Sequence, residues 1–363
     1  MAYTTIDDPS AFFQALVYAG TGGLNLPVTH TNTGNSDLQP DLIWFKDRGA
    51  GYSHAIMDSS RGRAKVIYPD VVNSEVSSGV NDDLVSFDTD GFKVGAPSNA
   101  NSTNGGTTSK VAWQWKANGG TTASNSNGSI TSTVQANTDA GFSIVTYTGT
   151  GSAATVGHGL GVTPDMIIFK NRSGANVWAT YHQSLGNNLK LELNGTGAQD
   201  ADGAFMNGTL PTSSVFSVGA SANTNTGSSN YVAYCFNDVQ GYSKFGKYIG
   251  NGSGTSDGTF NGTFVYTGFS PSFLMIKRSD GGVEDWNMFD NKRQTFNYNQ
   301  KKLYANQSAA ESGNVYDAVD FLSNGFKIRT GRGGTNTSGG TYIYMAFAEN
   351  PFTTSTGIPT TAR

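Results

Sequence analysis

The chain repeats three times the pattern of Pro164–Arg172, PDMIIFKNR. Pro40–Arg48 reads PDLIWFKDR, and Pro271–Arg278 reads PSFLMIKR. Each copy is a proline, a run of large apolar residues and a basic end. Proline is tolerated at the start of a strand, and an uninterrupted apolar run is typical of a strand buried on both faces. We therefore predict three equivalent central strands. The copies begin 124 and 107 residues apart, so the repeating unit has the size of a small domain.

Composition favours short strands joined by tight turns. Of the 363 residues, 47 are glycine and only 14% are charged, which disfavours helices. Regular strands with turn signals predict an all-β fold of three tandem antiparallel β-sandwich repeats, of jelly-roll or lectin-like type. The expected domains are 1–123 with an N-terminal lead, 124–243, and 244–363 with a C-terminal tail. The small polar stretches Gly119–Gly128 and Gln240–Phe245 are interpreted as linkers between domains arranged along one axis.

Two further strands recur in each predicted unit. The opening strands are rich in aromatic residues and end at glycine: Phe12–Gly20, Phe142–Gly149 and Phe264–Gly268. The closing strands alternate large and small residues: Val111–Trp115, Val232–Phe236 and Ile343–Phe347. Because side chains alternate between the faces of a strand, Trp113 and Trp115 share one face. We expect Trp115 and Phe236 to stabilise their own domains and to leave the other domains unaffected.

Charge and cysteine content exclude several classes of partner. The net charge of −4 gives no electrostatic reason to bind nucleic acid or an anionic membrane. No apolar run reaches the roughly 18 residues of a membrane helix. The acidic start, Met1–Pro9, lacks the basic region of a signal peptide. The single Cys235 excludes an intrachain disulfide and a cysteine zinc cluster. We expect no cofactor, no metal site and no insertion into a membrane.

The search for catalytic residues gives a negative prediction. Gly254–Gly258 matches the Gly-x-Ser-x-Gly elbow, but no strand and helix pattern surrounds it. Glu75 and Glu311 occupy equivalent positions in different units, so they are not expected to act as an acid/base pair. Asp88 and Asp90 are more simply explained by a hairpin turn than by calcium. The histidines show no close spacing of metal ligands: His30, His54, His158 and His182.

The five tryptophans have two interpretations. A tryptophan ring can stack on a sugar, but all five lie on predicted strands, where packing in the core is the favoured interpretation. They are Trp44, Trp113, Trp115, Trp178 and Trp286.

Several motifs together resemble a known family. They are the opening Met1–Pro9, the repeated Pro-Asp-apolar-Phe-Lys-x-Arg strand, the turn Gly157–Pro164, the hairpin Ser323–Ile328 and the ending Phe347–Phe352. The whole chain is similar to the uncharacterised β-rich repeat proteins of tailed bacteriophages, especially marine ones, usually labelled tail-fibre or virion structural proteins. The expected sandwich also resembles the concanavalin A-like lectin and glucanase architecture. The Glu-x-Asp-x-x-Glu pattern of those glucanases is absent, and Glu284-Asp285-Trp286 does not reproduce it.

The resemblance implies three functions. The leading expectation is a non-enzymatic virion protein, an exposed tail-fibre or appendage module that contacts host-surface glycan. The alternatives are a capsid decoration protein that stabilises the head shell and a glycan-cleaving enzyme. Expected partners are other virion proteins and further copies of the chain. The contact surface is predicted on the Gly/Asn/Thr loops Ser98–Thr108, Ala220–Ser229 and Gly331–Gly340, and the candidate contact residues are Asn101, Asn104, Asn223, Asn225, Arg332 and Asn336.

Overall fold

The computed structural model describes residues 2–24, 26–254, 260–313 and 318–360. Strands make up 41% of the chain and helices 2%, and the strand pairs are antiparallel. The prediction of an all-β fold is therefore confirmed. Within the described residues, the helical segments are the 3-10 turn η1 (Pro9–Ala11) and α1 (Asn101–Asn104), and neither approaches the length that crosses a bilayer.

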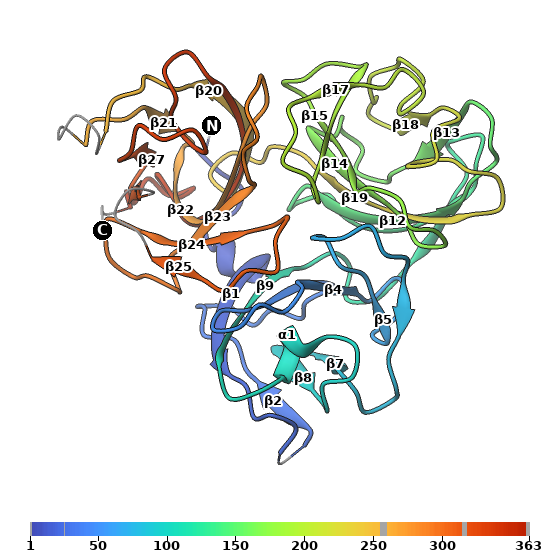
Figure 1. Ribbon diagram of the computed structural model, residues 1–363, viewed down its shortest axis with the longest axis horizontal. Helices are drawn as coiled ribbons and strands as arrows, with labels where there is room; N and C mark the ends of the chain where they lie inside the picture. The colour runs from blue at the N-terminus through green and yellow to red at the C-terminus, as the bar shows by residue number, and fades with distance from the viewer. Residues whose placement is uncertain (1, 25, 255–259, 314–317, 361–363) are drawn as a thin grey trace.

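The strands form three groups at the corners of a triangle, which we call the first, second and third lobes in chain order (Figure 1). The first lobe has a main sheet of order β1-β9-β3-β4, a small sheet of order β2-β8-β7 and the hairpin β5-β6. The bounds are β1 Phe13–Ala19, β2 Val28–His30, β3 Leu42–Asp47, β4 Ala55–Asp58, β5 Lys65–Val66, β6 Val76–Ser77, β7 Leu84–Asp88, β8 Gly91–Val94 and β9 Ser109–Trp115.

The second lobe has a main sheet of order β10-β11-β12-β19-β14-β15-β16-β17 and a small sheet of order β13-β18. The bounds are β10 Ala123–Asn125, β11 Ser132–Asn137, β12 Phe142–Thr148, β13 Ala154–Gly157, β14 Met166–Asn171, β15 Ala179–His182, β16 Leu189–Glu192, β17 Asp200–Ala201, β18 Val215–Val218 and β19 Asn230–Phe236.

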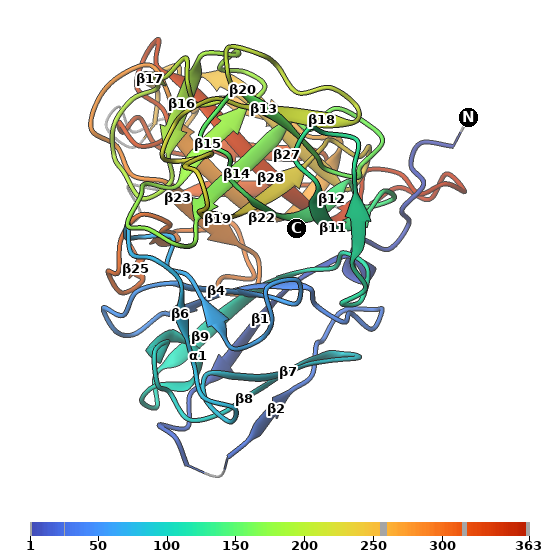
Figure 2. The same ribbon diagram turned by 90° about the vertical axis from the view of Figure 1, so that its right-hand side faces the viewer.

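The third lobe has a main sheet of order β20-β28-β22-β23-β24-β25 and a small sheet of order β21-β27-β26. The bounds are β20 Ser243–Ile249, β21 Phe264–Tyr266, β22 Phe269–Arg278, β23 Asn287–Asp290, β24 Lys301–Tyr304, β25 Ser312–Gly313, β26 Val319–Leu322, β27 Gly325–Ile328 and β28 Thr341–Pro351. Seen from the side, the first lobe lies below the other two (Figure 2).

The repeated proline motif forms an interior strand in every lobe. β3, β14 and β22 each pair with the closing strand of their lobe on one side and the following strand on the other. All residues of β3 and β14 are buried, as the uninterrupted apolar run predicts. Pro40 and Pro164 precede their strands, whereas Pro271 lies inside β22 at a register irregularity, where a missing N–H is tolerated.

Two predictions about the third repeat and the arrangement of the lobes are wrong. The opening strand of the third lobe is β20, which pairs with β28, whereas Phe264–Tyr266 belongs to the small sheet. The lobes are also not strung along one axis, since all three meet at the centre (Figure 1). The predicted boundaries after residues 123 and 243 lie within one residue of the starts of β10 at Ala123 and β20 at Ser243.

Each main sheet is buried on both faces. One face packs against the small sheet of its own lobe and forms a separate core, which in the first lobe contains Phe45, Phe92 and Ala112. The other face points to the centre, where one continuous core contains residues of all three lobes. Alternation along the closing strands divides the residues between the two cores, so Trp113 and Trp115 face the centre while Ala112 faces its own lobe.

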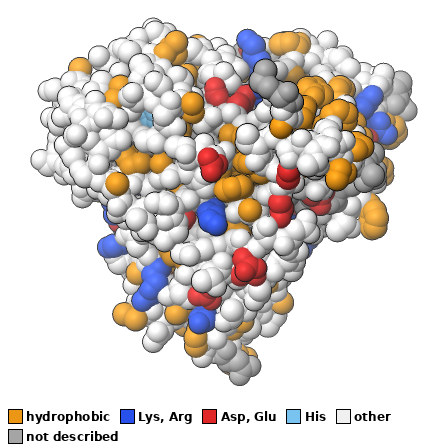
Figure 3. Space-filling view, turned by 180° about the vertical axis from the view of Figure 1, so that it is seen from behind, with side chains coloured by type: hydrophobic (Ala, Val, Ile, Leu, Met, Phe, Trp, Pro, Cys, Tyr) orange, Lys and Arg blue, Asp and Glu red, His pale blue; other side chains and the backbone are white. Residues whose placement is uncertain are grey.

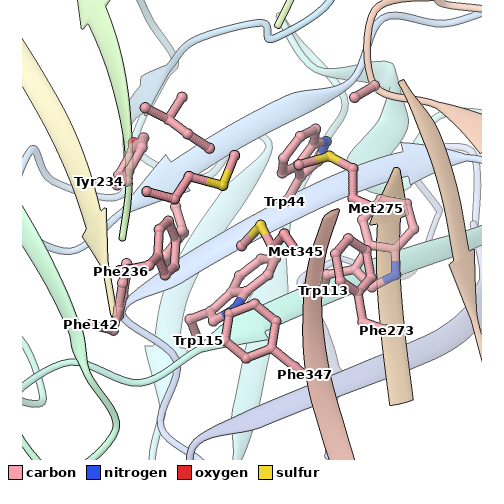
Figure 4. Close-up of a cluster of buried hydrophobic side chains, with 14 of the residues drawn as sticks. Trp44, Trp113, Trp115, Phe142, Tyr234, Phe236, Phe273, Met275, Met345 and Phe347 are labelled. Carbon is pink, nitrogen blue, oxygen red and sulfur yellow. The ribbon is translucent and has the colours of Figure 1, made fainter. Parts of the chain in front are cut away.

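Aromatic rings dominate the central core (Figure 4). Trp115, Phe236 and Phe347 occupy equivalent positions on β9, β19 and β28, and the ring of Trp115 lies 6.5 Å from Phe236 and 5.7 Å from Phe347 between centroids. All five tryptophans are at most 4% exposed, which confirms their interpretation as core residues. The shared core argues against lobes that unfold independently, because removing one ring opens a cavity against all three lobes.

Hydrogen bonds close the three lobes into a ring, and we call each contact between two lobes a seam. A buried lysine at the end of the central strand donates to a carbonyl of the neighbouring lobe in every seam: Lys46 Nζ to Ser308 O at 3.0 Å, Lys170 Nζ to Val72 O at 2.7 Å and Lys277 Nζ to Thr196 O at 3.0 Å. An aromatic ring nitrogen makes a second equivalent bond: His54 Nε2 with Tyr304 O, Trp178 Nε1 with Tyr68 O and Trp286 Nε1 with Glu192 O.

Two of the seams also contain a chain of charged groups. In the seam of the first and second lobes, Arg172 binds Glu75, Glu75 binds Arg61, and Arg61 binds Asp58. The equivalent chain in the seam of the third and first lobes is Arg48, Glu311, Arg293 and Asp290. In the seam of the second and third lobes the corresponding positions hold Ser279, Gln199, Leu185 and His182. The charged chain is therefore replaced there as a block.

Candidate functional site

Three of the predicted contact residues cannot touch a ligand. Asn104, Asn225 and Asn336 have no exposed surface. Their side chains fold the loops instead: Asn104 Nδ2 donates to Gly95 O at 3.0 Å, Asn225 Nδ2 to Ser152 O at 2.6 Å and Asn336 Nδ2 to Thr330 O at 2.8 Å. Prediction of these three as surface contacts is wrong, because a loop rich in glycine needs side-chain bonds to hold its backbone.

The other three predicted residues lie at the surface of their loops. Asn101 and Arg332 are exposed and Asn223 is half-buried. Asn101 and Arg332 line two separate pockets of about 450 Å³ each. These pockets lie at equivalent places in the first and third lobes. Each is lined by the loop, by the segment before β4 or β23, and by a tyrosine, Tyr68 or Tyr304, whose carbonyl accepts the ring-nitrogen bond of a seam. Each predicted contact loop therefore has some residues exposed at the surface and others buried beneath it.

The pocket of the third lobe is strongly polar. Two carboxylates and two cations meet around a tyrosine ring, and the loop contributes backbone through two glycines. The lining residues are Glu284, Asp285, Asn287, Lys302, Tyr304, Arg332, Gly333 and Gly334. A volume of about 450 Å³ lies within the range of small-molecule sites, and convergent polar groups are what fix the orientation of a ligand.

Hydrogen bonds hold the walls of this pocket. Asn287 Nδ2 donates to Gly334 O at 3.1 Å and so fixes the loop to β23. Asp285 Oδ1 accepts from Asn306 Nδ2 at 2.8 Å and from Gln307 Nε2 at 2.6 Å. The ammonium of Lys302 lies 4.7 Å from the centre of the Tyr304 ring. Asp285 and Lys302 are thus positioned before any ligand arrives, which reduces the entropy lost on binding.

Gly333 allows the carboxylate of Glu284 to lie against the loop. A Cβ atom built on Gly333 would stand 1.9 Å from Glu284 Oε1, so a side chain here must displace that carboxylate. Behind the pocket, burial lowers the pKa of Lys277 to about 8, and the charges of Glu284 and Asp285 oppose this shift. The pocket therefore combines an anionic wall, a cationic rim and a close approach of backbone.

The pocket of the first lobe has a different lining at the same position. Tyr68 takes the place of Tyr304, since each carbonyl accepts the ring nitrogen bond of its seam. Tyr52 and Ser53 stand where the third lobe has Glu284 and Asp285, immediately before the residue that makes the seam bond. The lining residues are Gly51, Tyr52, Ser53, Tyr68, Val71, Asn73, Val76, Asn99 and Asn101. None of these carries a charge, so the two pockets differ in chemistry.

The residues considered for catalysis or metal binding have structural roles. Glu75 and Glu311 are held in the ion pairs of two different seams. His54, His158 and His182 are buried and hydrogen-bonded to backbone carbonyls. No group of three histidine, cysteine or acidic side chains within the described ranges can hold a metal ion. The elbow pattern Gly254–Gly258 falls mostly on residues that the structure does not describe.

Most of the pocket was not predicted from the sequence. In the sequence, the acidic pair Glu284-Asp285 is notable only because it does not reproduce the glucanase motif, and Lys302 and Tyr304 give no signal. They meet only because β23 and β24 pair, with Asn287 opposite Tyr304. Tyr52 and Glu284 each stand two residues before a seam residue, His54 or Trp286, but the sequences around them differ, so their equivalence is visible only in the structure. Outside the pockets, the surface in Figure 3 carries scattered charges of both signs.

Comparison with known proteins gives one match. Residues 8–351 match the model of a family described as a domain of unknown function, DUF7483. No curated protein and no solved structure matches the chain.

Proposed function

The chain belongs to the DUF7483 family, and we propose that it is a non-enzymatic structural module of a bacteriophage virion that binds host-surface glycan through its third-lobe pocket. In this proposal the protein is an exposed tail-fibre or appendage component, assembled with other virion proteins and with further copies of itself. The similarity of its repeated motifs to tailed-phage repeat proteins supports the virion location. The lining of the pocket supports the proposal that the protein binds glycan.

The observation that carries the proposal is the convergence of Glu284, Asp285, Asn287 and Arg332 around the ring of Tyr304. A sugar offers vicinal hydroxyls, which donate to carboxylates and accept from a guanidinium, and an apolar C–H face, which packs on an aromatic ring. The mixed charge of the lining suits a glycan that itself carries acidic or amino groups. A purely apolar ligand would exclude water from these polar groups without offering them a hydrogen bond.

The scaffold behind the pocket supports a binding role. The seams fix the segments that line the pocket, since Glu284 N donates to Thr196 O of the second lobe at 3.0 Å. Such a wall changes little when a ligand binds, which favours recognition. A rigid body with a shared core also suits a particle that must survive outside the cell.

The test combines binding and turnover on one set of glycans. Purified protein is applied to an array of bacterial capsular and lipopolysaccharide glycans, and retention and released reducing ends are followed together. We expect retention of acidic or amino-sugar glycans without release. Arg332→Ala and Gly333→Ala are expected to weaken retention at least fivefold, the first by removing a charged donor and the second by displacing the Glu284 carboxylate.

A matched control separates the pocket from general charge effects. Lys247 is an exposed cation on β20, outside the pocket lining, so Lys247→Ala should leave retention unchanged. Sustained release of reducing sugar would show that the protein is a glycan-cleaving enzyme. Absence of both retention and release would overturn the binding role and favour the capsid decoration role, which imaging of the intact particle would reveal.

A further inference from the structure

We propose that the first-lobe pocket is a second carbohydrate site, and that it takes a neutral pyranose rather than a charged sugar. The inference extends the proposed function, because it assumes that these pockets bind glycan, but it concerns a different site and a different class of ligand. The protein would then have two carbohydrate sites on one rigid body, one for a charged sugar and one for a neutral sugar.

The two pockets occupy equivalent positions. In the third lobe, Asn336 O accepts from Gly252 N at 2.9 Å, and in the first lobe Asn104 O accepts from Gly22 N at 3.2 Å, so the two loops are superposable at these asparagines. Counting back three residues, Asn101 takes the place of Gly333. The side chain of Asn101 therefore stands where the third lobe exposes bare backbone, and it adds a carboxamide to the rim of the pocket.

The charged set of the third lobe is replaced as a whole. Where the third lobe has Glu284 and Asp285, the first has Tyr52 and Ser53, and Ala100 replaces Arg332. All the first-lobe lining residues are uncharged at neutral pH. A charged ligand would lose hydration here without gaining an ion pair, whereas a neutral ligand loses much less.

The remaining groups match the two kinds of surface on a pyranose. Tyr52 is 39% exposed and Tyr68 is half-buried, so two aromatic rings are available to the C–H face of a sugar. Asn73 and Asn101 offer carboxamides, each with donors and an acceptor, to the hydroxyls. Asn99, whose Nδ2 donates to Ser77 O at 3.1 Å, adds a carboxamide oxygen as an acceptor. Val71 and Val76 complete an apolar wall. Aromatic rings beside amides are the chemistry that a neutral polyol with an apolar face requires.

Tyr68 is held in place before a ligand binds. Its hydroxyl donates to Asn99 O at 2.9 Å, and its carbonyl accepts the indole N–H of Trp178 from the second lobe at 2.8 Å. Burial, with the charges of Asp83 and Asp70 nearby, raises the pKa of Tyr68 to about 12, so the phenol stays neutral. The floor of the pocket is thus a fixed ring, and Tyr52 lies exposed at its rim.

The test uses small probes that need no knowledge of the host. Methyl α-D-glucopyranoside, methyl α-D-galactopyranoside and methyl α-D-mannopyranoside are compared with glucuronate and glucosamine by saturation-transfer NMR and by titration. We expect at least one neutral glycoside to bind. Tyr52→Ala should weaken that binding about tenfold and Asn101→Ala a few-fold, the usual effects of removing a stacking ring and a neutral hydrogen-bonding group.

Two controls keep the result interpretable. Tyr52→Phe retains the ring and should lose much less affinity than Tyr52→Ala does. Asn223→Ala removes a half-buried asparagine from the corresponding loop of the second lobe and should have no effect. The unfolding temperature of each variant shows whether a loss of binding is a loss of fold.

The outcomes separate this inference from the proposed function. The inference is overturned if none of the neutral glycosides binds, if glucuronate or glucosamine competes at the same site with equal affinity, or if both Tyr52→Ala and Asn101→Ala bind normally. It stands if a neutral glycoside binds, Tyr52→Ala or Asn101→Ala weakens that binding, and Arg332→Ala leaves it intact. Loss of array retention with Arg332→Ala, while neither Tyr52→Ala nor Asn101→Ala affects the glycosides, would support the third-lobe site and reject this one.

Discussion

Trp113 of the first lobe donates its indole N–H to Asp290 Oδ2 of the third lobe at 2.9 Å, and the guanidinium of Arg293 lies 5.6 Å from the same indole. The other charged seam has the same arrangement, with Tyr234 donating to Asp58 Oδ2 at 2.7 Å. In the third seam, Met345 takes the position of these donors, and its thioether side chain has no N–H or O–H to donate. A donor on one lobe therefore accompanies a buried carboxylate on the next.

Trp113→Phe should destabilise the whole protein by about 1–3 kcal/mol, because it leaves a buried carboxylate with one bond fewer. Asp290 and Arg293 are both fully buried at their side chains, so water cannot replace the lost donor. The measurement is chemical denaturation. Met345→Leu is the matched control, since a swap of similar volume at the equivalent position removes no hydrogen bond and should cost less than about 1.5 kcal/mol. Equal losses for both variants would contradict the role of the bond.

Trp115→Ala should lower the stability of all three lobes together, by about 3–5 kcal/mol. The ring contacts Phe13 of its own lobe, Phe236 of the second and both Phe273 and Phe347 of the third. Calorimetry is expected to show a single unfolding transition, and the substitution should lower its temperature. Val145→Ala, which acts on the separate core of the second lobe, should shift the same single transition. Three transitions, of which one moves, would show that the lobes fold independently.

The seam lysines predict an unusual response to alkaline pH. Burial lowers the pKa values of Lys46, Lys170 and Lys277 to about 8, against 10.5 for an ordinary lysine. Between pH 8 and pH 10 the unfolded chain therefore binds more protons, and stability rises with pH by about 1 kcal/mol per lysine from pH 8 to pH 9. Urea denaturation at several pH values measures this rise. Lys170→Met should reduce the slope by about a third, and a slope unchanged by the substitution would contradict this origin.

His182 predicts a loss of stability in weak acid. Burial lowers its pKa to about 4, although its bond with Tyr344 O opposes the shift. Below pH 6.5 the unfolded chain takes up a proton that the folded chain does not, so stability falls as pH drops from 6.5 to 4. At pH 5 the contribution is about 2 kcal/mol. His182→Gln should remove this part of the pH dependence, whereas His158→Gln tests whether any buried histidine has the same effect.

The sequence predicted local structure better than arrangement. The run Met166-Ile167-Ile168-Phe169 is apolar throughout, and such a run has few stable alternatives to an interior strand. By contrast, β20 carries Lys244 and Gly246 and gave a weaker strand signal than Phe264–Tyr266, so the wrong segment was assigned as the opening strand. Strand propensity describes a residue and its neighbours, whereas position in a sheet depends on partners far along the chain.

The closure of the three lobes into a ring and the lining of the pockets could not be predicted, because both depend on residues that are far apart in the sequence. Glu75 and Glu311 were recognised as equivalent, but their partners Arg172 and Arg48 lie in other lobes, at positions that no local pattern connects. Asn104 and Asn336 were assigned to the surface because asparagine in a glycine-rich loop is usually exposed. Both are buried, since each is the polar centre around which its loop folds.

Among the described residues, the seam of the second and third lobes lacks the charged chain that its two sister seams contain. In an assembly of three identical chains, one mutation alters every interface at once. Within one chain, a single interface holds Leu185, Gln199 and Ser279 while the other two hold chains of charged groups. A chain with three lobes can therefore change one interface by substitution and leave the other two as they are.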